Sequence, residues 1–459
     1  MIHRYQKKGL NFVLDVNSGA VHLLDDISYA VSGLLDENMG DTCPQSIIDA
    51  LPDYTADEIR EAYDELYELK KAGQLFAQDD YIDVSRYIPV NAPVKALCLH
   101  VAHDCNLRCQ YCFASTGDFG QGRKIMPPEI AKKAIDFVIA RSGVRHNIEV
   151  DFFGGEPLMA WDTVTQTVDY ARSLEEKYNK KFRFTITTNG LLLDEDKRKY
   201  INENMDNCVL SLDGRREVND EFRKTVAGTG SYDTIVPKFK ALVDERDPNL
   251  DYYARGTFTS HNLDFAEDVL SIADAGFDRL SVEPVTADPG CGYDLTEDDL
   301  PKIEAEYDRL TDIMLERKKE GKPFTFFHFM VDLDQGPCVV KRLRGCGAGY
   351  EYVAVTPDGD IYPCHQFVGK EEFKQGSVLD QSFNMDIAQK FAGMNIYSRP
   401  KCQKCWAKFY CSGGCSAANY NMNHDMNDSY DLGCEMERKR LECAIYLKAM
   451  DKICANQSK

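Results

Sequence analysis

The sequence predicts an α/β fold: a TIM-like partial (β/α)6 barrel, preceded by a small winged-helix-like domain and followed by a cysteine-rich region. Three observations carry this prediction. Six short apolar runs alternate with helical patterns across the middle of the chain, which is typical of parallel strands joined by helices. A separate block of short strands and helices comes before these runs, and clustered cysteines come after them.

Composition limits the classes of function. The 459 residues leave room for two or three domains, and 43% hydrophobic content is ordinary for a globular protein. No apolar run suits a membrane span or signal peptide, so we expect a cytoplasmic protein with no membrane partner. The net charge of −21 disfavours nucleic acid. The odd count of 17 Cys favours metal ligation over disulfides, and therefore an anaerobic, oxygen-sensitive protein.

Residues 1–80 predict a winged-helix-like domain. Three extended pieces fall within 2–23, helical patterns cover 27–35, 44–50 and 56–71, and a short strand is expected at 74–77. The domain has no catalytic cluster of side chains, and its many acidic residues disfavour DNA, so we interpret it as a binding module. Residues 81–94 read as a linker.

Residues 95–325 predict the barrel. Strands are expected at 95–101, 148–153, 182–187, 208–212, 253–258 and 279–283, with helices at 127–141, 161–178, 194–203, 231–245 and 264–275 and a closing helix at 298–320. Each strand ends in a polar or glycine-bearing motif. Barrels of this kind place their chemistry at those ends.

Three thiols follow the first barrel strand within one loop: Cys105, Cys109 and Cys112. The C-x3-C-x2-C spacing brings three sulfurs to three corners of a 4Fe-4S cluster and leaves the fourth iron open for a substrate or cofactor. The alternative is a zinc knuckle or a chance group of core thiols. Zinc would need a fourth ligand at short range, and His103 precedes Cys105 by only two residues. The pattern therefore favours a catalytic cluster.

This loop resembles the signature of the radical S-adenosylmethionine (SAM) enzymes, which have an aromatic residue before the third Cys, here Tyr111. The resemblance implies SAM as cofactor, bound at the open iron, and it implies further contacts at later strand ends. These would come from Gly154, Gly155 and Glu156 to the methionine amino group, from Asn189, from Ser211 and Asp213 to the ribose, and from Arg223 to the carboxylate. Alternatively, these are ordinary strand exits, Arg223 is a solvated helix residue, and Asp213 is a base.

The last third carries a second set of thiols. Residues 326–440 form the predicted domain, and 441–459 a C-terminal helix. One interpretation of these thiols is a zinc site, because C-x2-C pairs are typical of zinc ribbons. The layout resembles the SPASM extension of radical SAM enzymes, which implies two auxiliary 4Fe-4S clusters and three in all. One would be held by Cys402, Cys405, Cys411 and Cys434, and the other by Cys346, Cys364 and Cys415. The sequence does not decide whether Cys338 is a further ligand of the latter cluster. We expect Cys43, Cys98, Cys208, Cys291, Cys443 and Cys454 to be packing residues.

The run VLDVNSGAVHLLDD resembles the SCIFF peptide maturases, a thioether-forming group of the ranthipeptide or sactipeptide type. This implies an oxidoreductase in which a 5′-deoxyadenosyl radical abstracts hydrogen, and a Cys sulfur then joins a carbon of an acceptor residue, usually Thr, in a ribosomally made Cys-rich precursor peptide. The N-terminal module would bind the leader of that peptide, and a flavodoxin or ferredoxin would supply electrons. The alternatives are a formylglycine-forming anaerobic sulfatase maturase and a non-enzymatic metal-binding interaction protein.

Overall fold

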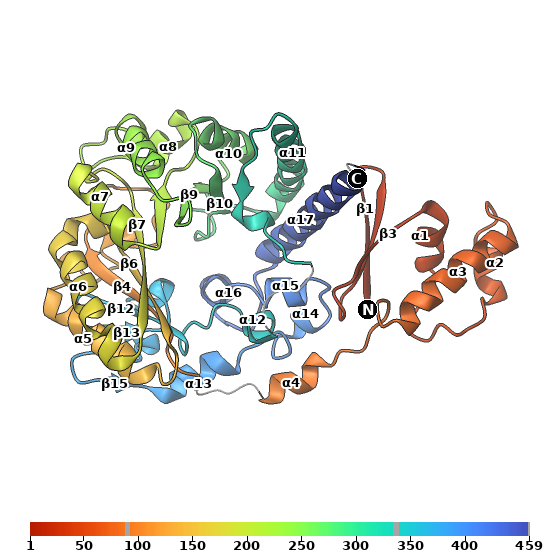
Figure 1. The fold of residues 1–459 in the computed structure, drawn as a ribbon, viewed down its shortest axis with the longest axis horizontal. Helices are drawn as coiled ribbons and strands as arrows, with labels where there is room; N and C mark the ends of the chain where they lie inside the picture. The colour runs from red at the N-terminus through yellow and green to blue at the C-terminus, as the bar shows by residue number, and fades with distance from the viewer. Residues whose placement is uncertain (88–91, 334–338, 458–459) are drawn as a thin grey trace.

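The computed structural model describes residues 1–87, 92–333 and 339–457 (Figure 1). A large sheet runs through the barrel and into the cysteine-rich region, in the order β11-β10-β9-β8-β7-β6-β4-β12-β13-β14-β15. The six expected barrel strands are all present and parallel: β4 Ala96–His103, β6 Asn147–Gly154, β7 Lys181–Thr188, β8 Asn207–Ser211, β9 Asp251–Phe258 and β10 Arg279–Pro284.

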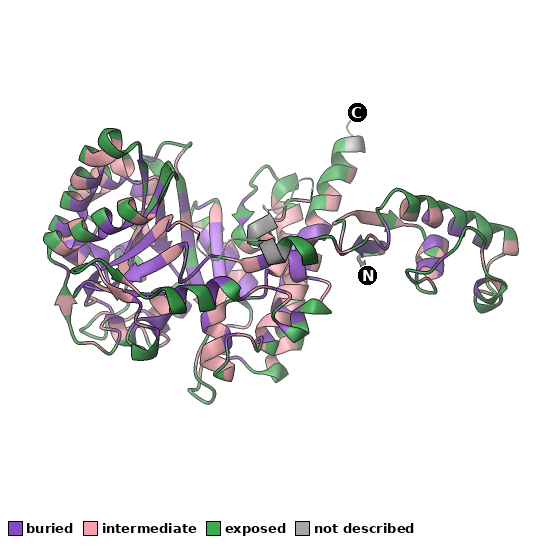
Figure 2. Cartoon of the chain, turned by 90° about the horizontal axis from the view of Figure 1, so that it is seen from below, coloured by how far each residue is buried: buried purple, intermediate pink, exposed green. Residues whose placement is uncertain are grey.

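Helices follow the strands and cover the outer face of this sheet. They are α5 Pro128–Arg141, α6 Trp161–Tyr178, α7 Glu195–Asn204, α8 Arg216–Phe222, α9 Tyr232–Asp244, α10 Phe265–Asp274 and α11 Leu300–Lys319. Alternation along the strands supplies the core: Phe182, Phe184 and Ile186 of β7 are fully buried, while Lys181 and Arg183 are exposed. Figure 2 shows the strands buried and the outer helix faces exposed. The α/β partial barrel is therefore confirmed.

The N-terminal region contains a three-stranded antiparallel sheet, β1 Ile2–Lys7, β2 Leu10–Asp15 and β3 Val21–Leu24. Lys8 and Gly9 form the first turn, both with positive φ, which matches the twist of a tight hairpin. Three helices follow, α1 Asp26–Ser32, α2 Gln45–Ala50 and α3 Ala56–Lys71, the last with a Thr55–Glu58 capping box. The strand expected at 74–77 is wrong, since those residues form no strand, and the expected linker contains helix α4 Tyr81–Tyr87.

Both faces of the N-terminal sheet are covered. Val13 packs with Tyr63 of α3 in one cluster, while Phe12 and Leu14, which point the other way, pack with Ile445 of the last helix. That helix, α17, spans Asp431–Gln457 and lies between α11 and the N-terminal sheet (Figure 1). It starts ten residues before the predicted boundary at 441. The N-terminal region is thus packed against the cysteine-rich part of the chain.

The cysteine-rich region continues the barrel sheet. Strand β12 Tyr352–Val355 pairs parallel with β4, and β13 Asp360–Tyr362, β14 Gly376–Ser377 and β15 Ser382–Phe383 extend it antiparallel; β5 Lys124–Ile125 and β11 Thr325–Phe326 are short additions. The remaining helices are α12 Val339–Arg344, α13 Met385–Gly393, α14 Pro400–Gln403, α15 Lys408–Cys411 and α16 Ser416–Asn423. No helix in the described part of the chain is both long and apolar enough to cross a membrane.

Candidate functional site

The three thiols of the first loop lie together at the end of β4. Cys105, Cys109 and Cys112 line one cavity of about 250 Å³. Burial raises the pKa of Cys105 to about 12 and that of Cys109 to about 11. Such thiols ionise when a metal replaces the proton. A donor set made of thiols around a cavity of this size fits an iron–sulfur cluster, because soft thiolates are the ligands of such clusters.

Two glycines bring the end of β6 against this loop. A Cβ on Gly154 would overlap Ala102 O, and a Cβ on Gly155 would overlap Asp104 O. Gly155 N also donates to Ala102 O at 2.7 Å. The backbone therefore approaches the loop more closely than any other residue type would allow. Both glycines line the cavity, as the resemblance implied for the methionine end of SAM.

Glu156 joins the ends of β6 and β7. Its fully buried carboxylate accepts hydrogen bonds from Thr188 Oγ1 and Asn189 N, both at 2.7 Å, and from Leu158 N at 3.0 Å. Burial raises its pKa, and these bonds oppose the rise. Asn189 in turn donates through Nδ2 to Asn106 Oδ1 at 2.8 Å and lies 3.5 Å from Cys105 Sγ. Glu156 thus fixes the strand end that positions Asn189 beside the first thiol.

Tyr111, Asp213 and Arg223 form one buried group. The Tyr111 hydroxyl donates to Asp213 Oδ2 at 2.5 Å and accepts from Arg223 Nη1 at 2.7 Å, and Arg223 lies 3.7 Å from Asp213 Oδ1. Ser211, Tyr111 and Arg223 line the cavity, but Asp213 does not. Asp213 is 1% exposed and accepts from Thr257 N at 3.2 Å. Asp213 is therefore bonded to Tyr111 and does not line the cavity, and its contact with the ribose stays a prediction.

Four thiols of the second set lie around one cavity. Cys402, Cys405, Cys411 and Cys434 together line a cavity of about 200 Å³. Burial raises the pKa of Cys411 to about 12 and that of Cys434 to about 11. Three cationic side chains line the same cavity: Lys401, Lys408 and Arg438. The all-thiol donor set again fits an iron–sulfur cluster. Each of the three cations is paired with a carboxylate: Lys401 with Asp431, Lys408 with Asp79 and Arg438 with Glu435.

The other three thiols also neighbour one another. Burial raises the pKa of Cys364, and Cys415 and Cys346 raise it further. Cys364 is buried, whereas Cys346 and Cys415 are exposed. Cys338 lies outside the described residues. Among the described residues, no three His, Cys, Asp or Glu side chains gather at the spacing of a single metal ion.

A polar group at the mouth of the first cavity escaped the sequence analysis. Arg255 of β9 pairs with Glu283 of β10, and both line the cavity together with His365. His328 lies 3.8 Å from Glu283, and burial lowers its pKa to about 3. The sequence feature that points to this polar group is the arginine within the strand DYYARGTF.

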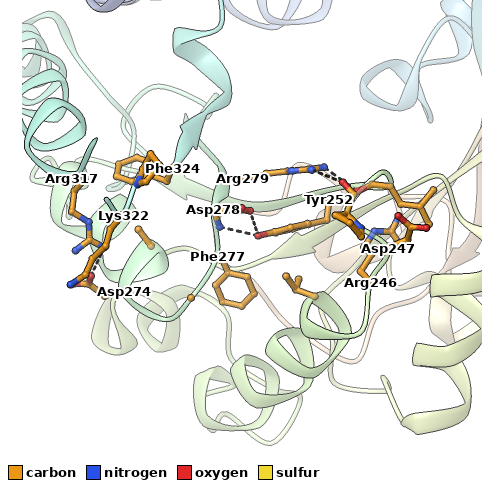
Figure 3. Close-up of a pocket in the computed structure, with 16 residues that line it drawn as sticks. Arg246, Asp247, Tyr252, Asp274, Phe277, Asp278, Arg279, Arg317, Lys322 and Phe324 are labelled. Atoms are coloured by element: carbon orange, nitrogen blue, oxygen red, sulfur yellow. Dashed lines mark hydrogen bonds and ion pairs between the residues drawn. The ribbon is translucent and has the colours of Figure 1, made fainter. Parts of the chain in front are cut away.

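A further cavity of about 520 Å³ lies at the opposite strand ends, before β9 and β10 (Figure 3). Two pairs of its polar side chains bind each other: Arg317 binds Asp274 at 2.6 Å, and Tyr252 donates to Asp278 at 2.6 Å. No thiol lines it. The chemistry therefore belongs to the cavity at the carboxyl ends of the strands.

Comparison with known proteins agrees with this geometry. Residues 99–251 match the Radical SAM superfamily, and residues 346–406 match the SPASM iron-sulfur cluster-binding domain. The chain therefore contains a radical SAM region followed by a SPASM region, and the cofactors that go with these regions are SAM and iron–sulfur clusters.

Three relatives illustrate the likeness. The cysteine-type anaerobic sulfatase-maturating enzyme of Clostridium novyi is 25% identical, over 72% of this chain and 90% of its own. The structure of anSMEcpe with bound AdoMet and Kp18Cys peptide superposes with a TM-score of 0.63 at 21% identity, over 78% of this chain and 99% of its own. Streptococcus suis SuiB bound to precursor peptide SuiA gives 0.53 at 17% identity, over 94% and 98%.

Proposed function

We propose that this enzyme forms a thioether cross-link between a Cys sulfur and a carbon of an acceptor residue, Thr by resemblance, in a Cys-rich precursor peptide. The observation that carries the proposal is the packing of the N-terminal sheet against the second thiol set. His3 of β1 stacks on Trp406, the neighbour of Cys405, with ring centroids 3.8 Å apart. A peptide held at the N-terminal sheet would therefore lie beside an auxiliary site.

The proposed roles follow the site. Cys105, Cys109 and Cys112 would hold the SAM-binding cluster. One auxiliary cluster would be held by Cys402, Cys405, Cys411 and Cys434. The other would be held by Cys346, Cys364 and Cys415 and would have an open corner for a substrate thiolate. SAM bound at the first cluster supplies a radical that abstracts hydrogen from an unactivated carbon. Tyr111, Arg223 and the glycine pair would orient it. A flavodoxin or ferredoxin remains the proposed electron donor.

The leader is proposed to bind at the edge of the N-terminal sheet. Strand β3 pairs only with β2 among the described strands, and Leu23 on it is 42% exposed. An extended peptide can add to such an edge through its main chain. The likeness to SuiB supports this reading, since it covers 94% of the chain against 78% for anSMEcpe.

Sulfatase maturation is the second candidate. It is favoured by the higher TM-score of anSMEcpe and by the identity to the Clostridium novyi enzyme. Removing the N-terminal region would not separate the two candidates cleanly, because Phe12 and Leu14 pack on Ile445 and their loss would uncover an apolar surface. The substrate is the better variable.

The test offers the anaerobically reconstituted enzyme two peptides: the Cys-rich precursor encoded beside its gene, and a sulfatase segment with the Cys that becomes formylglycine. We expect the precursor to lose two hydrogens per cross-link by mass spectrometry and to lose reactivity toward iodoacetamide at one Cys. Cys105→Ala is the inactive control. An aldehyde in the sulfatase segment with an unchanged precursor would favour the second candidate and contradict the proposal.

A further inference from the structure

A buried arginine lies between the two auxiliary thiol sets. Arg399 directly precedes α14 and is 3% exposed. Its Nη1 donates to Gly413 O at 2.7 Å and its Nη2 to Ser416 Oγ at 3.0 Å. Gly413 makes room for it, since a Cβ there would overlap Arg399 Nη1. The guanidinium is thus held in a fixed place by the loop that carries Cys411 and Cys415.

One donor of this guanidinium is unused. Arg399 Nε is buried and has no hydrogen-bond partner among the described residues. A buried donor without a partner costs about 1–3 kcal/mol, and an acceptor that is not part of the protein chain would remove that cost. The sulfurs of an iron–sulfur cluster commonly accept hydrogen bonds from such donors.

The charge of Arg399 has no carboxylate partner either: within the described ranges no Asp or Glu forms an ion pair with it. Burial lowers its pKa, and thiols from both sets oppose the change, namely Cys402 and Cys411 of one set and Cys415 and Cys346 of the other. A buried guanidinium stays charged, and it needs negative charge nearby. Thiolates and the clusters they hold would supply that charge on both sides.

We propose that Arg399 is a positioning residue shared by the two auxiliary sites, where its charge and its free Nε–H raise the reduction potentials of both clusters. This inference rests on the proposed function. A cation beside a cluster stabilises the form that carries one more electron. Because the guanidinium is bonded to the loop that joins Cys411 of one set to Cys415 of the other, both potentials should respond together, which keeps the pair matched for electron exchange.

Arg438 provides a contrast within the same region. It lies 4.0 Å from Cys405 Sγ, but it pairs with Glu435, and it lines the cavity of Cys402, Cys405, Cys411 and Cys434 alone. We expect Arg438→Gln to shift one auxiliary potential and Arg399→Gln to shift two. Arg246→Lys is the control for replacing a buried arginine, since Arg246 is 7% exposed and donates to Met205 O in the barrel, where the neighbouring thiol, Cys208, is not a proposed cluster ligand.

The test is a redox titration of the anaerobically reconstituted full chain, followed by electron paramagnetic resonance, with iron and sulfide content measured first. Arg399→Gln should lower both auxiliary potentials by about a tenfold change in the reduction equilibrium, or 59 mV for one electron. Arg399→Lys, which keeps the charge but loses the fork, should shift both in the same direction by less. The barrel cluster should keep its potential in every variant.

The outcomes separate cleanly. Unchanged auxiliary potentials in Arg399→Gln, or a shift of one alone, would overturn the shared role. If Arg399→Gln fails to take up iron, Arg399→Lys decides by the same criterion. Wild-type protein that binds iron at the barrel site alone would instead contradict the proposed function.

Discussion

The hydroxyl of Tyr111 donates to Asp213 Oδ2 at 2.5 Å, which links the cluster loop to the end of β8. The same oxygen accepts from Arg223 at 2.7 Å. The aromatic residue before the third thiol therefore does more than fill space. Its hydroxyl binds the buried carboxylate of Asp213 and the buried guanidinium of Arg223 at the wall of the cavity.

Tyr111→Phe should weaken SAM binding at least tenfold. The variant keeps the ring but removes a hydrogen bond from each of two charged groups, and each such bond contributes about 1.5–3 kcal/mol. Equilibrium dialysis with reconstituted protein measures the effect. Tyr293→Phe, which loses only a bond to Gln110 O at the rim, is the control. Equal affinity in both variants would contradict the assigned role of Tyr111.

Cys434→Ala should lose about four irons per chain, because the cavity lined by Cys402, Cys405, Cys411 and Cys434 would lack one of its four thiolates. Iron and sulfide assays on anaerobically reconstituted protein give the count. Cys208→Ala is matched as a buried thiol of the barrel core and should keep full iron content. Full iron in Cys434→Ala would remove this residue from the ligand set.

Gly155→Ala should abolish SAM binding, since the new methyl group overlaps Asp104 O and must displace either the loop or the end of β6. Gly393→Ala is the comparison. That glycine lies in α13 with open space around it, and alanine there should stabilise the helix by about 0.5–1 kcal/mol. SAM binding by Gly155→Ala at wild-type affinity would show that the close approach is unnecessary.

Asp79→Ala should destabilise the region around α15. Lys408 has a side chain only 4% exposed and pairs with Asp79 at 2.8 Å, so the variant leaves a buried ammonium unpaired, at a cost of about 2 kcal/mol. Hydrogen–deuterium exchange should show faster exchange in α15. Asp57→Ala removes an exposed pair with Arg60 and should change nothing measurable. Unaltered exchange in Asp79→Ala would refute the prediction.

Asp151→Asn should stabilise the protein at neutral and alkaline pH. Burial raises the pKa of Asp151 to about 7, above the roughly 3.9 of the unfolded chain. Between these values the folded state binds more protons, so this group lowers stability as pH rises, and the loss is complete above about 7. The gain in melting temperature of the variant should therefore grow from pH 5.5 to 7 and then level off. A pH-independent gain would assign the effect to packing.

Much of the fold follows from local pattern. Short apolar runs located all six barrel strands, and the helical spacing of apolar residues located α3 to the residue. The thiol spacings located two groups that each line one cavity, Cys105, Cys109 and Cys112 in one and Cys402, Cys405, Cys411 and Cys434 in the other, and their role as cluster ligands stays a prediction. These features depend on residues near one another in sequence, so the sequence contains the signal.

Other features depend on distant partners. The pairing of β12 with β4 joins segments about 250 residues apart, and a four-residue strand carries little periodicity. The bond between Tyr111 and Asp213 and the pair of Arg255 with Glu283 likewise arise only when strand ends meet. Residues 74–77 have strand-like composition, but no neighbouring strand receives them, so they form none.

The union of β12 with β4 also bears on biosynthesis. At about 5–20 residues per second, the ribosome delivers β12 some tens of seconds after β4. During that interval the first strand of the barrel offers an open, apolar edge, which is a site for unwanted pairing between nascent chains. Chaperones that cover this edge during the interval should therefore raise the yield of native protein.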